Sequence, residues 1–511
     1  MALRQSRERS IASTLKILLA AVIILVQVAL IVVLAVYPRR YAVIVCSALW
    51  VVGFAGAVAI FCSRGGAHYK TTWIMLFLAF PIAGTILYAL WGGAARRRKT
   101  YIARKVEDPE SMRMRDELNA DKLAKASPGW SRVMNSLKVC GFQVYRNTRI
   151  VYFNEGKALL EDILDRCRRA ERFIFLEFYL FAEGKLGDRL TEILCEKANE
   201  GVEVKIVFDS YGSLTRLGGE TVVRLREAGA EVFEFGPVHK FVSKLRLSCR
   251  DHRRIACIDD YAFTGGTDVA DECANITTRF GYRKDSGIRL EGEGSWAFTK
   301  SFLETMSILG GLARHEMDYY HPHGDIRTEG WCQPYTDALH DGRDDQAENT
   351  FLQLITNAKR FLYITTPHFV PDESIVRALC IAGDGGVDIR LMLPGMPDSN
   401  FSDQVAESYF GELIQHGVKV YRYTPGFLNQ KCVMVDREIA TVGSVNIDYR
   451  SFELDRECGA VVYGCPMIEE LLEDMDDLVE KSHQVTLDEW SERKLSRKVI
   501  EPLLRLLAIW L

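Results

Sequence analysis

An internal repeat is the feature that most constrains how this chain can fold. The apolar run that starts at Arg172 (Arg-Phe-Ile-Phe-Leu-Glu-Phe-Tyr-Leu) matches the run that starts at Arg360 (Arg-Phe-Leu-Tyr-Ile-Thr-Thr-Pro-His). In both copies a helical pattern precedes this run, and a second apolar run follows it, at Gly201 and at Gly386. Buried strands that alternate with amphipathic helices are typical of an α/β layer. We therefore predict two copies of one α/β unit.

A polar motif closes each copy at the matching place. It consists of a polar residue, a cation and an aspartate, filled by His252, Arg254 and Asp259 in the first copy and by Asn429, Lys431 and Asp436 in the second. Side chains two apart on a strand share a face, so the first two members of each motif point to the same side. The aspartates have the opposite parity, and we expect them to fix a turn or orient neighbours rather than to transfer protons. A glycine-containing stretch follows, with Gly265, Gly266 and Asp268 in the first copy and Gly443, Ser444 and Asn446 in the second.

These paired motifs resemble the His-x-Lys-x4-Asp signature of the phospholipase D superfamily. The flanking stretches look like those of bacterial cardiolipin synthases over about residues 70 to 511, with supporting stretches at Leu176-Glu-Phe-Tyr, Thr365-Thr-Pro-His-Phe-Val-Pro-Asp and Ala440-Thr-Val-Gly-Ser-Val-Asn. The resemblance implies a fold in which two α/β lobes meet and place both motifs across one active site. It also implies a set of substrate-binding residues, namely Glu177, Gly266, Asp268, His368, Ser444 and Asn446.

The resemblance implies a reaction as well: the phosphatidyl group of one phosphatidylglycerol passes to a second, giving cardiolipin and glycerol, without a metal or other cofactor. A neutral imidazole that attacks phosphorus forms a phosphohistidine and splits one difficult step into two easier ones. A second imidazole, as its cation, protonates the departing glycerol oxygen and later takes a proton from the incoming alcohol. Neighbouring cations stabilise the negative equatorial oxygens. The expected set is therefore two histidines and two cations.

This chain departs from the expected set at two main positions. Arg254 replaces a lysine, which keeps the positive charge but exchanges a compact ammonium for a planar fork. Asn429 replaces a histidine, and an amide cannot donate a proton to an alkoxide. The symmetry of the motifs permits His252 to be the nucleophile, and Asn429 then occupies the acid position. The resulting hypothesis is a slow enzyme, or one that stalls at the phosphohistidine.

Smaller departures and a substitute acid complete the prediction for the site. His368, at the end of the second copy's first strand, is a candidate for the missing acid, although a partly buried histidine without a chemical role fits the same position. In the first copy Asp268 stands where the second has Asn446, and the hairpin between Asp259 and Ala262 is one residue shorter than its counterpart. Such a change is either neutral turn variation or a shift of register near Arg254.

The first hundred residues predict a membrane module. Three apolar runs, 17–37, 41–62 and 73–91, approach the roughly 20 residues that a helix needs to cross a bilayer. Arg96, Arg97, Arg98, Lys99, Arg104 and Lys105 follow the third run, and this basic collar predicts that the large body lies on the cytoplasmic side. We therefore expect a multi-pass protein of the bacterial cell membrane.

The predicted fold class is α/β, with two duplicated lobes behind an α-helical transmembrane module. The predicted domains are the membrane module with three transmembrane helices (1–105), the first lobe (106–325) and the second lobe (326–511). A net charge of -4 argues against a nucleic-acid partner. Thirteen cysteines without a Cys-x-x-Cys pair indicate reduced thiols, which suits a cytosolic body. The expected partners are anionic phospholipid (phosphatidylglycerol) and the membrane, and an oligomer or a paralogue partner is left open.

Two other functions fit the same residues. Asn429 is compatible with a catalytically silent descendant that binds anionic phospholipid or partners an active paralogue. A phospholipase D-like hydrolase or nuclease shares the fold, although the apolar runs and the acidic balance disfavour a nuclease.

Overall fold

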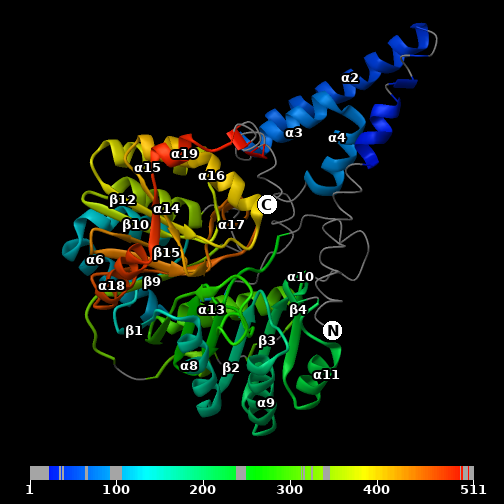
Figure 1. Ribbon diagram of the computed structural model, residues 1–511. Helices are drawn as coiled ribbons and strands as arrows, with labels where there is room; N and C mark the ends of the chain where they lie inside the picture. The colour runs from blue at the N-terminus through cyan, green and yellow to red at the C-terminus, as the bar shows by residue number, and fades with distance from the viewer. Residues whose placement is uncertain are drawn as a thin grey trace. The chain divides into compact units, whose positions relative to one another are not determined.

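The computed structural model describes residues 22–30, 32–33, 36, 39–63, 67–92, 106–213, 215–236, 249–311, 313–314, 317–323, 326–337, 346–494, 497–498 and 504–505. Contacts divide the chain into two compact units (Figure 1). The smaller unit contains the N-terminal helices, and the larger unit contains the two large β-sheets. Each unit is described by itself.

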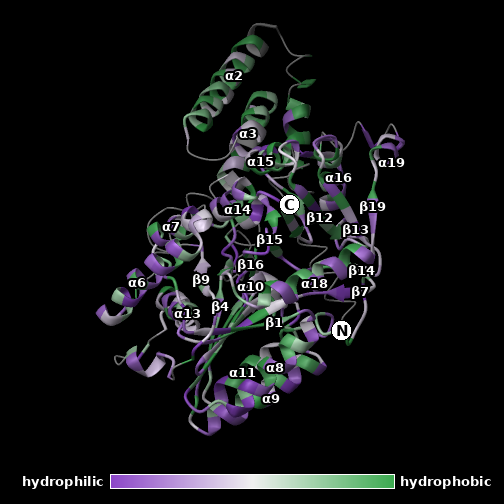
Figure 2. Ribbon diagram, turned by 90° about the vertical axis from the view of Figure 1, so that its left-hand side faces the viewer, coloured by the Kyte–Doolittle hydropathy of each residue, from purple (hydrophilic) through white to green (hydrophobic). Residues whose placement is uncertain are grey.

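In the smaller unit, α2 (Arg39–Phe61) packs against α3 (Ala67–Ala79) and α4 (Pro81–Leu87). Within the described residues, one helix segment, Val43–Phe61, is long and apolar enough to cross a membrane. Figure 2 shows α2 as hydrophobic along most of its length. This segment lies within the second predicted run, 41–62. The first run, 17–37, and the basic collar at 96–105 lie partly or wholly outside the described residues.

The third predicted run, 73–91, is not one continuous helix, and that expectation was wrong. Helix α3 ends before Phe80, and α4 begins at Pro81 and passes into a π-helical turn, η1 (Tyr88–Gly92). Proline breaks a helix because it lacks an N–H and its ring clashes with the preceding turn. The side chain of Gln27, the one polar residue in the first apolar run, is buried and accepts a hydrogen bond from the Ala83 N–H (2.7 Å) in the first turn of α4.

The first lobe is a seven-stranded mixed sheet in the order β1-β8-β6-β5-β2-β3-β4. Helices α8, α9 and α11 belong to this lobe, and the apolar faces of all three pack into one hydrophobic core. The bounds are β1 (Thr148–Phe153), α8 (Gly156–Arg169), β2 (Phe173–Phe178), α9 (Lys185–Asn199), β3 (Glu203–Asp209), α10 (Ser210–Ser213), α11 (Gly219–Glu227), β4 (Glu231–Phe235), β5 (Ile255–Ile258), β6 (Tyr261–Gly265), β7 (Tyr282–Lys284), β8 (Gly287–Gly292), α13 (Ser295–Leu309) and η3 (Met317–Tyr320).

The second lobe is an eight-stranded sheet in the order β19-β13-β12-β10-β15-β16-β18-β9. Its elements are β9 (Trp331–Thr336), α14 (Gln346–Asn357), β10 (Phe361–Thr365), β11 (Phe369–Val370), α15 (Glu373–Asp384), β12 (Asp388–Pro394), α16 (Asn400–Gln415), β13 (Lys419–Tyr423), β14 (Gly426–Leu428), β15 (Cys432–Val435), β16 (Ile439–Gly443), β17 (Ile447–Asp448), α17 (Tyr449–Glu453), β18 (Cys458–Tyr463), α18 (Met467–Glu480), β19 (Ser482–Val485) and α19 (Leu487–Ser491).

The two sheets have the same strand order once the repeat is aligned. Strands β1, β8, β6, β5, β2, β3 and β4 correspond to β9, β18, β16, β15, β10, β12 and β13, and β19 is an addition at the edge of the second sheet. The shorter first-copy hairpin does not change the register, because Ile255 pairs with Thr264 as Cys432 pairs with Val442. The missing residue is absorbed in the turn. The predicted mixed α/β duplication is therefore present.

One hydrophobic core joins the two lobes. It contains strand residues of both sheets together with the apolar faces of α13 and α18. Helix α18 of the second lobe contacts β1 of the first, and α7 (Ser131–Val139), which follows α6 (Glu110–Ala126) and η2 (Pro128–Trp130), contacts α14 and β9 of the second lobe. Residues near 131–139 thus pack on the second lobe although they precede the first. A shared core of this kind holds the lobes in one fixed arrangement.

Candidate active site

The two motifs meet through a pair of matching backbone contacts between the lobes. The N–H of His252 donates to the carbonyl of Arg456 (2.9 Å), and the N–H of Asn429 donates to the carbonyl of Lys284 (2.7 Å). Strand β14, just before Asn429, pairs in parallel with β7 of the first lobe. Position 252 and position 429 therefore occupy equivalent places, each bonded to the opposite lobe. These backbone contacts bring the two motifs together between the lobes, as the expected single site requires.

His252 is oriented by a carboxylate of the second lobe. Its Nδ1 lies 2.7 Å from Oε1 of Glu457, which is fully buried directly before β18. The hydroxyls of Ser444 and Ser451 also donate to Glu457. Burial raises the pKa of Glu457 well above its usual range, while Arg254 and the two hydroxyls act in the opposite direction. Because three donors converge on this group, we assign it as the carboxylate, with the proton of His252 on Nδ1 and the lone pair on Nε2.

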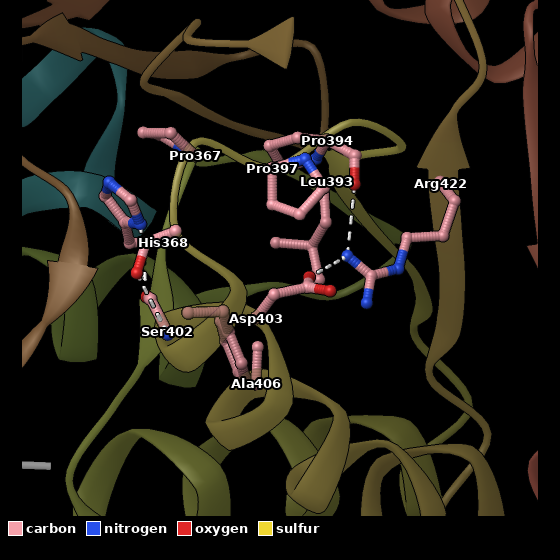
Figure 3. A pocket seen from close by; sticks show the side chains of 11 residues that line it. Pro367, His368, Leu393, Pro394, Pro397, Ser402, Asp403, Ala406 and Arg422 are labelled. Atoms are coloured by element: carbon pink, nitrogen blue, oxygen red, sulfur yellow. Dashed lines mark hydrogen bonds and ion pairs between the residues drawn. The ribbon is translucent and has the colours of Figure 1, made fainter. Parts of the chain in front are cut away.

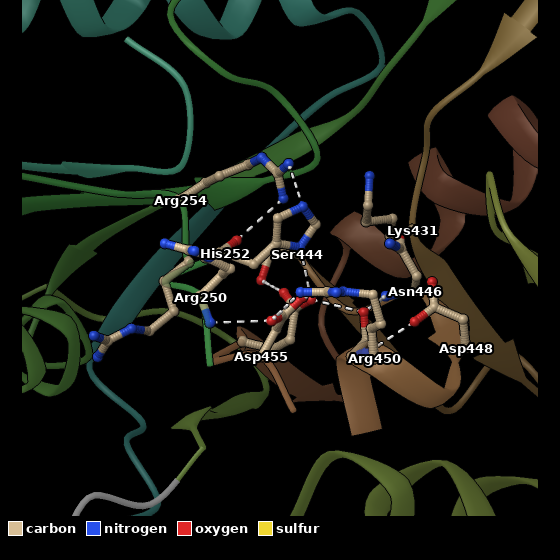
Figure 4. A network of polar contacts seen from close by, with 12 residues as sticks. Arg250, His252, Arg254, Lys431, Ser444, Asn446, Asp448, Arg450 and Asp455 are labelled. Carbon is tan, nitrogen blue, oxygen red and sulfur yellow. Dashed lines mark hydrogen bonds and ion pairs between the residues drawn. The ribbon is translucent and has the colours of Figure 1, made fainter. Parts of the chain in front are cut away.

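The environment of His252 keeps its imidazole neutral. Burial and the charge of Arg254 lower the pKa of His252 to about 3. A guanidinium nitrogen of Arg254 lies 3.1 Å from Nε2, and the ring of Tyr179 packs edge-on at 4.8 Å between centroids. A neutral imidazole with a lone pair on Nε2, which here faces the guanidinium of Arg254, suits a nucleophile and does not suit a proton donor. Figure 4 shows His252 and Arg254 within the polar network between the lobes.

Arg254 is bound to the second departure of the first copy. One of its guanidinium nitrogens lies 3.0 Å from Oδ2 of Asp268, and both side chains are buried. The Oδ1 atom of Asp268 also accepts the N–H of Leu180 (3.0 Å). The two substitutions of the first copy, arginine for lysine and aspartate for asparagine, therefore form one buried ion pair. This pairing keeps Arg254 charged, since a nearby opposite charge favours the ionised form.

Asn429 reproduces the contacts of a neutral histidine without its chemistry. Its Nδ2 donates to Oδ2 of Asp285 (2.7 Å) and to the carbonyl of Gly266 (2.7 Å), and its Oδ1 accepts from Nζ of Lys431 (2.9 Å). Asp285 belongs to the first lobe and lies just after β7, as Glu457 lies just before β18. Each half thus has a carboxylate from the opposite lobe, Glu457 for His252 and Asp285 for Asn429, and we call these two the crossed carboxylates. In the second half the carboxylate holds an amide in place of an imidazole.

The glycine at position 266 is required by a close approach of the lobes. A Cβ atom there would lie 2.7 Å from the carbonyl oxygen of Asn429 and 3.2 Å from Nζ of Lys431, and it would collide with Asp285. The matching residue in the second copy is Ser444, whose hydroxyl reaches Glu457. Gly266 and Ser444, both expected to bind substrate, therefore lie where the two motifs are in close contact.

Two buried polar atoms at the site lack hydrogen-bond partners within the described part of the chain, namely Nε of Arg254 and Oδ1 of Asn446. An unsatisfied buried polar atom costs about 1–3 kcal/mol. Such atoms are commonly completed by a ligand or by water, so their position beside both motifs supports a binding site for a polar group.

The motif aspartates lie at the hairpin turns, away from the first residues of the motifs. Asp259 accepts the N–H groups of residues 171, 172 and 173, and Asp436 accepts those of residues 359, 360 and 361, at 2.8–3.1 Å. Both have positive φ, 49° and 55°. Their position fits the expected turn-fixing and orienting role, because each carboxylate fastens the loop that leads into β2 or β10.

Glu177, which the resemblance implies as a substrate-binding residue, is bound to an arginine in the interior of the first lobe. Its side chain is 1% exposed and binds the fully buried guanidinium of Arg253 at 2.6 Å. Arg253 is the middle residue of the first motif and also binds Asp251 and the hydroxyls of Ser301 and Thr305. Glu177 therefore stabilises the interior behind the motif.

His368 lies in a separate small pocket of the second lobe. Its Nδ1 is 3.1 Å from the hydroxyl of Ser402 (Figure 3). Its Nε2 is 3.7 Å from Asp398. Pro394, Asp403 and Arg422 also line this pocket. In the described part of the chain, no hydrogen bond or ion pair joins His368 to either motif.

Reasoning from sequence missed the crossed carboxylates Asp285 and Glu457. The signal was available in the repeat: Lys284-Asp285-Ser286-Gly287 matches Arg456-Glu457-Cys458-Gly459, with an acidic residue before the same glycine in both copies. Tyr179, which packs on His252, was noted only as part of a strand.

Comparison with known proteins places the chain among relatives. A family model described as "Cardiolipin synthase, PLD-like domain" matches residues 351–479. A protein of Streptococcus mutans named "Uncharacterized protein" is 33% identical over 86% of this chain and 95% of its own. The "Cardiolipin synthase" of Halalkalibacterium halodurans is 31% identical over 88% of this chain and 90% of its own.

Among solved structures, the phosphatidylserine synthase of Haemophilus influenzae superposes with a TM-score of 0.56 at 13% identity. The match covers 74% of this chain and 100% of that protein. At this identity the likeness supports the fold alone.

Proposed function

This chain belongs to the cardiolipin synthase family of the phospholipase D superfamily, and from that premise we propose that it transfers a phosphatidyl group from one phosphatidylglycerol to a second through a phosphohistidine at His252. The products are cardiolipin and glycerol. The observation that carries the proposal is the His252–Glu457 pair, in which a buried second-lobe carboxylate holds a neutral imidazole whose Nε2 lone pair faces the guanidinium of Arg254.

The phosphate lies between the two cations of the motifs. Arg254 carries a permanent charge, and Lys431 stands at the matching place of the second copy. These cations stabilise the negative oxygens of the transition state. The Nε–H of Arg254 can donate to a phosphate oxygen, and Oδ1 of Asn446 can accept from a headgroup hydroxyl. Gly266 and Ser444 lie where the two motifs approach each other closely. Asp268 holds Arg254 in an ion pair.

A lipid substrate agrees with the N-terminal unit. Segment Val43–Phe61 is long and apolar enough to cross a bilayer. We propose that residues 1–105 form a multi-pass module in the bacterial cell membrane and that the two lobes, 106–325 and 326–511, lie on the cytoplasmic side. Labelling of single cysteines placed beside the predicted spans, in intact cells and in inverted vesicles, tests this topology.

The experiment for the activity uses purified full-length protein and vesicles of phosphatidylglycerol labelled in the phosphate. We expect labelled cardiolipin and a covalent label on His252, identified by mass spectrometry after a rapid quench. Phosphatidic acid in place of cardiolipin would indicate a hydrolase. A protein that forms neither product nor covalent label, even as Asn429→His, does not carry out the proposed reaction.

The second candidate is a silent phospholipid-binding descendant, and Asn429 is the observation that favours it. The polar atoms of the amide are already bonded within the protein, and an amide does not titrate near neutral pH. Vesicle binding without turnover would support this candidate.

A further inference from the structure

Two titratable side chains contact Asn429 directly, the carboxylate of Asp285 and the ammonium of Lys431. The amide N–H groups of Asn429 donate to Asp285 and to the Gly266 carbonyl, and its Oδ1 accepts from the ammonium of Lys431. In the first copy the atom matching this Oδ1 is Nε2 of His252, which faces Arg254. Lys431 thus lies next to the place where a second imidazole would present its proton.

One N–H group of the Lys431 ammonium has no acceptor among the described residues. Nζ donates to Oδ1 and to the backbone carbonyl of Asn429, both at 2.9 Å. A lysine ammonium has three N–H groups. Within the described residues the third finds no acceptor, so it is available to an oxygen of a bound substrate.

The two cations of the site differ in their counter-ions. Arg254 has Asp268 at 3.0 Å, whereas no described carboxylate lies within 4.0 Å of Nζ of Lys431. The second copy has the neutral Asn446 where the first has Asp268. Lys431 is also 4% exposed. A buried ammonium without a counter-ion is costly, and the cost is relieved by loss of the proton.

The charges around Lys431 come from both lobes. Burial and Arg254, which precedes β5, lower its pKa, as does Arg283 on β7; Asp285 after β7 and Glu457 before β18 oppose them. The net result is a pKa of about 7 for Lys431. Near neutral pH the protonated and neutral amines are then present in comparable amounts, which suits a group that must both give and take a proton.

We propose that Lys431 has taken over the acid and base steps that Asn429 cannot perform. This inference rests on the proposed phosphatidyl transfer. In the family pattern the residue at this position is a cation beside the phosphate; here it acts as the proton donor and acceptor as well, and Arg254 remains the permanent charge.

The steps balance without a further reactant. Nε2 of His252 forms a bond to phosphorus while the bond from phosphorus to the departing glycerol oxygen breaks, and Lys431 gives that oxygen a proton and becomes a neutral amine. The hydroxyl of the second phosphatidylglycerol then gives its proton to Lys431 as its oxygen bonds to phosphorus. The P–N bond breaks, cardiolipin leaves, and both side chains return to their starting states.

The test compares four purified full-length proteins: wild type, Lys431→Arg, Asn429→His, and the double variant Asn429→His/Lys431→Arg. Arginine retains the charge but does not titrate near neutrality. The control Lys481→Arg changes an exposed lysine. Glycerol release and covalent labelling of His252 from labelled phosphatidylglycerol are followed in a single turnover between pH 5 and 9.

We expect Lys431→Arg to slow glycerol release by about 10²–10⁴-fold, the usual worth of general acid–base assistance. We also expect it to remove the limb of the pH profile near 7. Wild type should release glycerol more slowly as the pH rises through this limb, because the acid form of Lys431 is lost. In the Asn429→His background an imidazole can supply the proton, so Lys431→Arg should cost less than about 10-fold there.

An unchanged rate and pH profile in Lys431→Arg would overturn the proposal. An equal loss in both backgrounds would also overturn it, because Lys431 would then serve only to bind the phosphate. If wild type and Asn429→His form no covalent label and no cardiolipin, the proposed function itself fails, and this outcome is visible before Lys431 is altered.

Asn446→Asp provides a second variant should Lys431→Arg not fold. Position 446 corresponds to position 268, where Asp268 is the counter-ion of Arg254. The substitution therefore offers Lys431 a carboxylate of its own. A counter-ion should raise the pKa of Lys431 and move the limb to higher pH. A limb that stays in place would contradict the assignment to Lys431.

Discussion

The two halves of the site have matching backbone hydrogen bonds but differ in the charges of their side chains. In the first half His252 is held by Glu457, and Arg254 is paired with Asp268. In the second half Asn429 is held by Asp285, and Lys431 has no carboxylate partner among the described residues. Both halves therefore have the same hydrogen-bonding frame. In our proposal the nucleophile lies in the first half and the group that transfers protons lies in the second.

Making the first half resemble the second should have the largest effect. His252→Asn removes the only imidazole of the paired motifs but can keep a donor toward Glu457, as Asn429 does toward Asp285. We expect cardiolipin formation to fall by at least about 10⁴-fold, as when a nucleophile is removed. Covalent labelling of the protein should disappear with it. Labelling that persists in His252→Asn would place the nucleophile elsewhere.

The crossed carboxylates should differ strongly in importance. Glu457→Gln keeps the size of the side chain but no longer stabilises the Nδ1 tautomer of His252, and we expect phosphohistidine formation to slow by about 10²–10⁴-fold. The matched variant Asp285→Asn, which touches Asn429, should cost less than about 10-fold. Single-turnover rates, with KM measured separately, test this difference. Equal effects of the two variants would mean that Glu457 acts only on the fold.

The buried ion pair of the first half should be visible in stability. Asp268→Asn leaves Arg254 buried without its partner, and we expect the free energy of unfolding to fall by about 3 kcal/mol. Adding Arg254→Lys, which recreates the Lys/Asn pair of the second half, should recover part of this loss. The control Asp477→Asn breaks an exposed pair with Lys481 and should cost less than about 1 kcal/mol. Denaturant unfolding of the wild type and of these three variants measures the losses, and a loss in Asp268→Asn no larger than in the control would contradict the coupling.

Restoring the second histidine should have the smallest effect. Because Lys431 already performs the proton transfers in our proposal, Asn429→His should accelerate turnover by only about 10-fold and shift the neutral limb of the pH profile toward the pKa of the new imidazole. An acceleration of about 10³-fold or more would show that the wild-type protein lacks an effective acid. The steady-state rate of cardiolipin synthesis is the measurement.

The extent to which the site could be predicted varied with the kind of signal. The strand runs, the repeat and the aspartate turns have local signatures, and the observed sheets follow them. The resemblance implies a substrate-binding role for Glu177, whereas the structure shows its side chain buried against Arg253 in the interior. The third apolar run was expected to be one helix because its hydrophobicity is continuous, but Pro81 interrupts it.

Sequence by itself determined the duplication, the α/β class, the pairing of two polar motifs and the absence of a second histidine, because each of these is a matter of residue type and spacing along the chain. Only the tertiary structure decided that Glu457 orients His252 across 205 positions of sequence, and that two separate substitutions form the Arg254–Asp268 pair. It also decided that Lys431 lies buried with no carboxylate of the described residues within ion-pair distance. These properties depend on burial and on distances between side chains from different lobes, and a pattern of neighbours along the chain contains neither.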